Sequence, residues 1–300
     1  MNIDHLKLFS RVAETQNISV AGREMSLSPA VASSYISKLE TSLGTRLVHR
    51  TTRKVALTEE GEAFLSHARD VLDSVEAAYS SVGKGTQSPS GILRVTAPAS
   101  FGRLHLMPGL KGFMEKYSDL TVDFRFSDAI VDMVEGGFDI AIRNAALEDS
   151  SLIARKLAAD SRIVCASPGY LARFGVPATP AELKQHDCIH LSGSDSWTFK
   201  SGKDLVSVKT HAKFRTDNGD ALRHACIDGL GIGINSVWSI HSQLARGELV
   251  QILRDYPLVS DTALWALYPS NRQLASKVRA FIDYYVEYFA SKDCWHRFAD

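Results

Sequence analysis

The chain has 300 residues, 45% hydrophobic and 23% charged, as in an ordinary globular protein of about two domains. Lysine plus arginine and aspartate plus glutamate each number 34, which excludes a uniformly basic chain but leaves room for a local basic segment. No apolar run is long enough to span a membrane. The early charges Asp4, Lys7, Arg11 and Glu14 are atypical of a secretion signal, so we expect a cytoplasmic location.

The first part of the chain predicts three helices in close succession. Apolar residues at spacings of three and four mark a first helix over residues 3–15, and Asn17 can cap a second over residues 19–25. Ser28 and Pro29 are typical of a helix start, and Gly44 of a helix end. We therefore expect a third helix over residues 29–43.

The third helix has one apolar stripe and an opposite face of small or polar side chains. That face carries Ala30, Ser33, Ser34, Ser37 and Lys38. Two helices joined by a tight turn, with small hydroxyls on the second, are typical of a helix-turn-helix that enters the DNA major groove. The alternative interpretation is a helix surface that only contacts solvent. The charges of the neighbouring segment distinguish between the two interpretations.

A basic segment follows the third helix and favours DNA binding. Residues 38–57 contain Lys38, Arg46, Arg50, Arg53 and Lys54 against Glu40, a net charge of +4. A short basic hairpin after a recognition helix forms a wing whose cations bind phosphates. From residue 58 to 76 the net charge is instead −5, on an expected helix that Thr58 caps.

This acidic helix carries two apolar stripes. The first stripe is a heptad-like seam formed by Phe64, Ala68, Val71, Val75, Ala78 and Val82. The second stripe consists of residues spaced seven apart, which are Leu65, Leu72 and Tyr79. Burial within its own domain is one interpretation. We expect instead that the seam joins two subunits and that the second stripe packs on the helix-turn-helix.

Several motifs occur in the order and spacing typical of one family. They are SLSPAVA at 26–32, KLE at 38–40, LGTRL at 43–47, RTTR at 50–53 and LTEEG at 57–61. In these residues the chain resembles LysR-type transcriptional regulators, and weaker landmarks follow at 139–143, 149–152, 167–170 and 229–232. The resemblance implies a winged helix-turn-helix, a dimerising linker helix and a two-lobed α/β effector domain similar to a periplasmic binding protein.

The expected domain limits follow from these motifs. The DNA-binding domain covers residues 1–58, and the linker helix with its hinge covers 59–90. The effector domain covers 91–300, with lobe one at 91–161 and 268–300 and lobe two at 162–267. The resemblance places the two crossings between lobes near residues 160–162 and 266–268.

Strand and helix patterns alternate after the linker. Strands are expected at 92–96, 120–126, 138–143, 162–166 and 232–235, and helices at 101–117, 129–135, from 179, at 217–228 and at 273–290. Such alternation indicates parallel sheets covered by helices on both faces. About 210 residues is large for one such sheet, which favours two lobes with a cleft.

Polar residues near strand ends are the candidate effector ligands. Ser100 and Phe101 follow the first strand of the domain, and Ser127 and Asp128 follow the next. The resemblance adds the segment around Trp197. Plain helix capping by Ser100 and Asp128 is an equally good interpretation.

Other chemistry has little support. The glycines at 229–233 lack the dinucleotide-binding order, and His186 to His190 lacks a second ligand pair for a metal. The distant cysteines Cys165, Cys188, Cys226 and Cys294 suggest no pair, and Cys165 fits a core strand. We expect no catalytic residue, no metal and no cofactor.

The sequence thus predicts a regulator that binds double-stranded DNA and is controlled by a small polar organic metabolite between two lobes. Expected partners are a second copy of the chain, in a homodimer or homotetramer, and RNA polymerase, with no membrane. The alternatives are a winged-helix repressor that needs no effector, a cytosolic small-molecule-binding protein and an enzyme. Our interpretation predicts that a bound ligand raises the unfolding temperature, whereas a winged-helix repressor that needs no effector should show no such rise.

Overall fold

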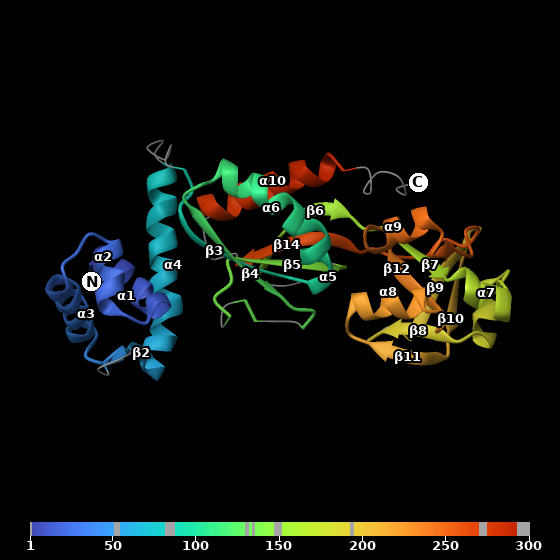
Figure 1. The fold of residues 1–300 in the computed structure, drawn as a ribbon, viewed down its shortest axis with the longest axis horizontal. Helices are drawn as coiled ribbons and strands as arrows, with labels where there is room; N and C mark the ends of the chain where they lie inside the picture. Colours follow the sequence, from blue (N-terminus) through green and yellow to red (C-terminus); the bar gives the residue numbers. More distant parts are fainter. Residues whose placement is uncertain are drawn as a thin grey trace. The chain divides into compact units, whose positions relative to one another are not determined.

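A computed structural model describes residues 2–50, 55–81, 88–129, 132–133, 136–146, 152–192, 195–269 and 275–292. The chain forms two compact units, which are treated separately below. The N-terminal unit contains residues 1–89, with 134–137 and 270–279, and the C-terminal unit contains residues 90–133, 138–269 and 280–300. Figure 1 labels their elements.

The predicted helix-turn-helix is present in the N-terminal unit. Its helices are α1 (Ile3–Thr15), α2 (Ile18–Glu24) and α3 (Pro29–Leu43). The Asn17 side chain accepts hydrogen bonds from two backbone N–H groups of α2, and Ser28 Oγ accepts one from Val31, 3.3 Å away. Gly44 ends α3 at φ 72°, a conformation that glycine adopts without steric cost. The predicted caps are confirmed.

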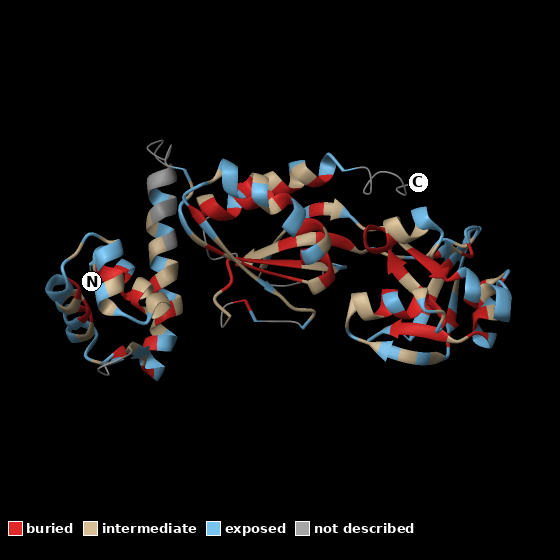
Figure 2. Ribbon diagram, viewed as in Figure 1, coloured by how far each residue is buried: buried red, intermediate tan, exposed pale blue. Residues whose placement is uncertain are grey.

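One apolar core holds these helices together. Leu6, Phe9, Ile36 and Leu39 are buried in it, and Leu65 and Ala68 of the following helix join them. Figure 2 shows this buried face in red and the exposed outer surfaces in pale blue. The apolar spacing read from the sequence therefore does mark the inner faces of the helices.

A two-stranded hairpin follows α3, as the wing prediction requires. Strands β1 (Val48–Arg50) and β2 (Val55–Leu57) pair antiparallel, with Val48 opposite Leu57. Residues 51–54 at the tip, including Arg53 and Lys54, lie outside the described residues, as does the side chain of Arg50. The hairpin leads into the linker helix α4 (Glu59–Ser81), where Thr58 Oγ1 accepts a hydrogen bond from the Gly61 N–H at 2.9 Å.

The roles predicted for the two apolar stripes of α4 are wrong near the start of the helix. Phe64 and Ala68, predicted for the subunit seam, pack instead in the N-terminal core, where the rings of Phe64 and Phe9 are 5.6 Å apart. Only from Val71, which is 36% exposed, does the predicted seam face outward. The two stripes lie close together around the helix, so one wide apolar face covers α1 over the first turns.

The C-terminal unit contains two five-stranded sheets, and we call each sheet with its helices a lobe. The first lobe has the strand order β4-β3-β5-β14-β6. Its strands are β3 (Gly91–Ala97), β4 (Leu120–Phe126), β5 (Ile140–Ala145), β6 (Leu152–Ala159) and β14 (Ala263–Pro269). Its helical segments are α5 (Ala99–Phe101), a π-helical turn (Gly102–Leu106), α6 (Met107–Lys116) and most of α10 (Ser276–Ala290).

The second lobe has the strand order β11-β8-β12-β7-β13, with a separate antiparallel hairpin of β9 and β10. Its strands are β7 (Arg162–Ala166), β8 (Cys188–Leu191), β9 (Ser196–Ser201), β10 (Asp204–Lys209), β11 (Ala212–Thr216), β12 (Ile232–Ser236) and β13 (Val250–Gln251). Its helical segments are α7 (Pro168–Phe174), a 3₁₀ turn (Pro180–Gln185), α8 (Gly219–Ile227) and α9 (Val237–Arg246).

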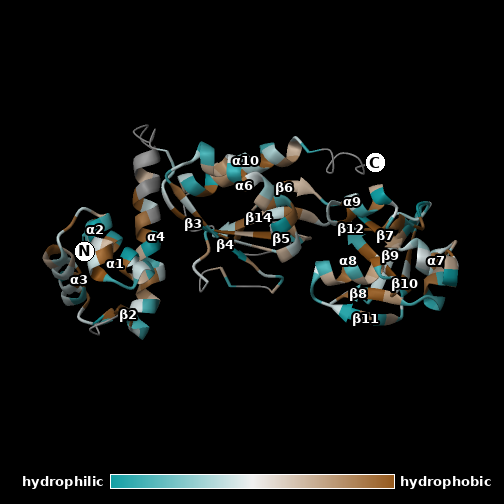
Figure 3. Cartoon of the chain, in the orientation of Figure 1, coloured by the Kyte–Doolittle hydropathy of each residue, from teal (hydrophilic) through white to brown (hydrophobic). Residues whose placement is uncertain are grey.

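Both sheets are mixed, whereas the sequence predicted parallel sheets. β3 runs parallel to β4 and β5, but β14 runs antiparallel to β5 and β6. In the second lobe, β12 is parallel to β8 and antiparallel to β7. The antiparallel members border the connections between lobes, where a strand enters or leaves a sheet without a crossover helix. Figure 3 shows the strands of both sheets rich in hydrophobic residues.

The first predicted crossing is confirmed and the second is placed too late. β6 ends at Ala159 and β7 of the other sheet begins at Arg162, as expected. The return was expected at 266–268, but these residues lie inside β14, which already belongs to the first lobe from Ala263. Sequence reasoning missed β14 and therefore extended the second lobe.

Three helix predictions also need correction. The helix expected over 101–117, with an interruption at Pro108, is interrupted earlier by a π-helical turn, and Pro108 lies at the start of α6. The segment after Thr179 is only a 3₁₀ turn, in which Thr179 Oγ1 donates to Glu182 at 3.0 Å. Within 129–135, residues 129, 132 and 133 are not helical, and the others lie outside the described residues.

Candidate functional site

The outer face of α3 is a surface of small and polar groups. Its predicted DNA-contacting residues Ser28, Pro29, Ala30, Ser34, Ser37 and Lys38 are exposed, and Ser33 is half-buried. On the opposite side of the helix, Ala32, Ile36 and Leu39 are fully buried. Burial fixes the helix in rotation about its axis, so the small face is presented outward as one unit.

Two contacts position α3 against its neighbours. Gly22 of α2 lies so close to Ala32 that a Cβ atom at Gly22 would come within 2.7 Å of the Ala32 methyl group. At the other end, the Glu40 carboxylate accepts hydrogen bonds from the N–H groups of Leu47 and Val48, at 2.9 and 3.2 Å. Glu40 therefore ties α3 to the wing, a role that a count of its charge alone did not reveal.

A cavity of about 800 Å³ lies in the C-terminal unit, and both lobes contribute to its wall. Of the predicted effector ligands, Ser100, Asp128 and Trp197 line it. Phe101 does not: it is fully buried, with its ring 5.7 Å from that of Phe289. Ser127 is also absent from the wall, and its hydroxyl accepts a hydrogen bond from the Ala129 N–H.

Asp128 connects the two lobes at this cavity. Its Oδ1 accepts a hydrogen bond from the Ala99 N–H at 3.1 Å, within the first lobe. Its Oδ2 accepts one from Asn218 Nδ2 at 2.6 Å, and Asn218 caps α8 of the second lobe through the Ala221 N–H. Asp128 thus binds the first backbone N–H of α5, and not a helix that follows its own strand as the capping interpretation expected, and it also makes a contact across the cavity.

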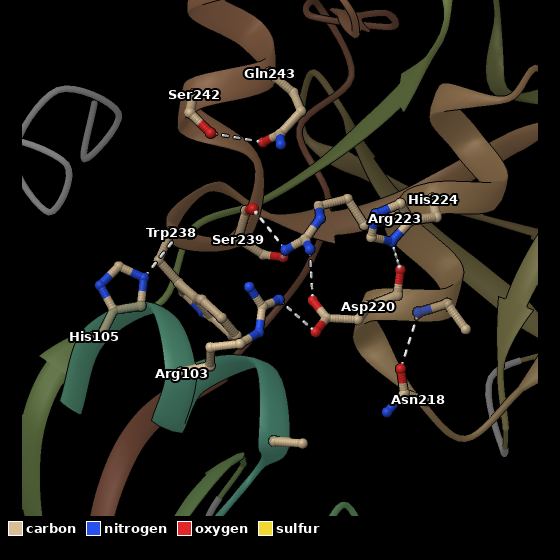
Figure 4. A network of polar contacts seen from close by, with 12 residues as sticks. Arg103, His105, Asn218, Asp220, Arg223, His224, Trp238, Ser239, Ser242 and Gln243 are labelled. Carbon is tan, nitrogen blue, oxygen red and sulfur yellow. Dashed lines mark hydrogen bonds and ion pairs between the residues drawn. The ribbon is translucent and has the colours of Figure 1, made fainter. Parts of the chain in front are cut away.

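A second set of contacts joins the lobes beside the cavity (Figure 4). Arg103 of the first lobe forms an ion pair with Asp220 of α8 at 2.6 Å, and Asp220 pairs with the buried Arg223 at 2.7 Å. His105 donates from Nε2 to the carbonyl oxygen of Trp238 at 3.0 Å. These residues hold the lobes together in the arrangement described.

Arg143 is a functional candidate that sequence reasoning missed. It lies near the end of β5, lines the cavity and donates from Nη1 only to the carbonyl of its neighbour Ile142. Burial lowers the pKa of its guanidinium, and the charge of Asp128 opposes that effect. The position of Arg143 at a strand end was visible in the sequence, but the wall that it joins comes from distant segments.

The cysteines differ from the sequence expectation in one respect. Cys165 and Cys226, expected not to pair, lie together in the second lobe, where Asn235 Nδ2 donates to both sulfur atoms at 3.4 and 3.6 Å. Both are fully buried, and the contact with Cys165 together with burial raises the pKa of Cys226. The Cys226 thiol therefore stays protonated and behaves as a packing group. Cys294 lies outside the described residues.

The histidines near 190 have separate partners. His186 bonds to the Tyr170 hydroxyl at 3.3 Å, and His190 to the Thr210 hydroxyl at 2.6 Å. Within the part of the chain that the structure describes, no cluster of three or more metal-ligating side chains occurs. None of the described helices combines the length and apolar character needed to cross a membrane.

Comparison with known families accounts for both units. Residues 3–62 match the model of the bacterial regulatory helix-turn-helix proteins of the lysR family, and residues 86–290 match the LysR substrate binding domain. The HTH-type transcriptional regulator DmlR of Escherichia coli K12 is 32% identical over 292 residues, covering 96% of this chain and 94% of DmlR.

Solved structures agree. CrgA, a LysR-type transcriptional regulator from Neisseria meningitidis, is 29% identical with a TM-score of 0.62, covering 97% of this chain and 100% of CrgA. The Vibrio cholerae virulence activator AphB is 30% identical with a TM-score of 0.59, covering 96% of this chain and 99% of AphB. The chain therefore belongs to the LysR family of transcriptional regulators, with a helix-turn-helix domain and a substrate-binding domain.

Proposed function

We propose that α3 binds in the major groove of operator DNA and that the wing binds the adjacent phosphates. Ser28, Pro29, Ala30, Ser33, Ser34, Ser37 and Lys38 are the proposed contacts on α3, and Arg50, Arg53 and Lys54 those on the wing. The observation that carries this proposal is the exposed small face of α3 opposite its fully buried stripe. Small side chains let the helix backbone approach the bases closely.

The cavity of the C-terminal unit is the proposed effector site. Ser100, Asp128 and Trp197 remain proposed ligands because they line it. Neither Phe101 nor Ser127 lines the wall, so the role proposed for them is to support their neighbours. The hydrogen bond between Asn218 and Asp128 joins the two lobes at the cavity. An effector that displaced Asn218 would change this contact, so the geometry supports a role for the cavity in switching.

The same proposal covers assembly and location. A homodimer or homotetramer brings several α3 helices to one operator, and the outward-facing Val71 offers part of a contact surface on α4. RNA polymerase is the natural partner of a protein that regulates transcription, and the cytoplasm of a bacterium is where both meet DNA. The proposed domain limits are 1–58, 59–90 and 91–300, with the lobe boundary corrected to lie before Ala263.

The DNA contacts are tested with the full-length chain on duplexes selected from a random pool. Lys38→Ala removes one phosphate-seeking charge, so its affinity should fall for every sequence and its salt slope should flatten by about one unit. Ser34→Ala should shift the preferred sequence and keep the parental slope. Both are measured by fluorescence anisotropy at several salt concentrations.

Lys111→Ala is the matched control, because Lys111 is an exposed lysine on α6 of the other unit. It should reproduce the affinity, the preferred sequence and the salt slope of the parent. A Lys38→Ala slope equal to that of the parent would remove Lys38 from the interface. Selection that enriches no sequence would remove the operator from the proposal.

A further inference from the structure

The cavity wall contains buried donors without hydrogen-bond acceptors. Among the described residues, Arg143 Nη2 and Trp238 Nε1 are both shielded from water and have no hydrogen-bond partner. Trp238 is only 6% exposed, and both residues line the cavity. Both atoms are covered by protein atoms, so a ligand reaches them only after the side chain turns toward the cavity. A buried donor without a partner costs free energy, and such a contact with an acceptor on a ligand removes that cost.

The charges around the cavity indicate the sign of the ligand. Arg162 is paired with Asp160 at 3.1 Å, and both oxygens of Asp128 already accept hydrogen bonds. Arg143 is half-buried and makes no direct ion pair with any described residue, although the charge of Asp128 acts on it. Asp128 and Asp217 both line the cavity, and their carboxylates disfavour a second negative charge on the ligand.

The wall also contains aromatic and apolar side chains, which alternate with polar ones such as Asn144 and Asn235. Trp197, Trp238 and Trp265 all line the cavity, together with leucine and isoleucine side chains such as Leu222 and Ile234. The indole N–H of Trp265 donates to the Ala145 carbonyl at 3.1 Å, so this side chain is held in place. A ligand with an apolar or aromatic body would bury its surface against such a wall.

We propose that the effector is an aromatic monocarboxylic acid whose carboxylate binds Arg143 and whose ring lies among the three tryptophans. This inference rests on the proposed effector function of the cavity and specifies its ligand class. Arg143 therefore selects for the anionic group, and the tryptophans select for the ring.

The test uses the full-length chain and its intrinsic tryptophan fluorescence, with calorimetry as a second readout. The probes are benzoate, 4-hydroxybenzoate, phenylacetate and cinnamate, each compared with its neutral amide, and succinate as a dianion without an apolar body. At least one aromatic carboxylate should bind at least about tenfold more tightly than its amide and than succinate.

Arg143→Met should weaken binding of that carboxylate at least about tenfold and leave binding of its amide nearly unchanged. Arg143→Lys, which keeps the charge without the planar donor pair, should lie between them. Arg155→Met is the control, since Arg155 is an exposed arginine of β6 that does not line the cavity. The unfolding temperature of each variant shows that the domain remains folded.

Three results would overturn the inference. They are no binding of any aromatic carboxylate below about 10 mM, succinate or the amides binding as tightly as the acids, and unchanged carboxylate affinity in folded Arg143→Met. DNA binding measured on the same samples separates the two proposals. Sequence-specific DNA binding without carboxylate binding keeps the regulator and removes the ligand class, whereas the reverse removes the regulator.

Discussion

His105 carries a titratable ring inside the aromatic cluster that joins the two lobes. It is 7% exposed, and its ring centroid lies 5.4 Å from Phe101 and 5.5 Å from Trp238. Burial lowers its pKa from 6.5 to about 4, and the hydrogen bond to the Trp238 carbonyl opposes this only in part. The folded chain therefore holds His105 neutral at pH values where the unfolded chain has protonated it.

The pH dependence of stability follows from this difference. Above pH 6.5 the neutral His105 ring makes its full contribution to the free energy of unfolding. This contribution is lost as the pH falls toward 4, because the unfolded state binds the proton first. The loss approaches about 3 kcal/mol in the free energy of unfolding. We expect His105→Gln to flatten the fall in unfolding temperature between about pH 6.5 and about pH 4.5, followed by tryptophan fluorescence.

His211→Gln is the control for this prediction, because His211 is exposed. Its unfolding temperature should follow the parental pH profile. A parental profile in His105→Gln would show that the ring is not held neutral, and that carboxylates alone produce the acid sensitivity.

Residues whose role depends on their own helix could be predicted, and residues whose role depends on the assembled wall could not. Ser28 and Gly44 act on backbone groups within three residues, so the local pattern suffices. Arg143 and Trp238 come from segments almost a hundred residues apart and meet only in the folded cavity. Phe101 follows Ser100 but does not line the cavity, because one helical residue turns the side chain by about 100°.

The junction of the wing and α4 depends on one glycine. Thr58 N donates to the Leu47 carbonyl at 3.0 Å, and Thr58 Oγ1 donates to the Arg46 carbonyl at 2.7 Å, so the start of α4 lies directly against β1. A Cβ atom at Gly61 would overlap the carbonyl oxygen of Leu47. The atoms of Leu47 nearest to that Cβ all belong to the backbone, which cannot move aside as a side chain can.

Gly61→Ala should therefore destabilise the N-terminal unit by about 1 to 3 kcal/mol and weaken DNA binding through a displaced wing. Chemical unfolding followed by circular dichroism, with DNA affinity on the same samples, measures both effects. Gly169→Ala in α7 adds the same methyl group where no atom lies within 4 Å, and should be neutral or stabilising. Equal stability of Gly61→Ala and the parent would mean that the junction has room to spare.

The elements of the DNA-binding domain could be predicted better than those of the sheets. Helix caps and apolar spacing are local signals, whereas a strand is completed by partners far along the chain. The hairpin of β9 and β10 was missed, although Trp197 and Phe199 alternate with polar residues and Gly202 turns at φ 60°. The direction of β14 was not predictable, because it follows from the return crossing between lobes and not from its own residues.

One carboxylate links both crossings of the C-terminal unit. Asp160 lies between β6 and β7, and its side chain accepts hydrogen bonds from Ser236 at 3.0 Å and from Thr262 at 3.1 Å, just before β14. Its side chain is fully buried. The outgoing and returning connections between the lobes are therefore joined at the same carboxylate.

Assembly of the whole regulator is predicted to depend on the outward face of α4. Val71 is an exposed apolar side chain of this face, while Leu65 and Ala68, nearer the start of the helix, are buried in the N-terminal core. In a symmetric dimer a glutamate at position 71 would place two carboxylates near each other in an apolar seam. We expect Val71→Glu to raise the dimer dissociation constant by at least about a hundredfold, measured by sedimentation velocity.

Ser66→Glu provides the matched control on the same helix. It adds the same charge five residues earlier, about 140° around the helix from Val71, and should leave the sedimentation profile unchanged. Dimers that persist in Val71→Glu would place the subunit contact elsewhere. Equal dissociation of both variants would show that added negative charge on an already acidic helix, and not the seam, controls assembly, because α4 carries Glu59, Glu60 and Glu62 in its first turn.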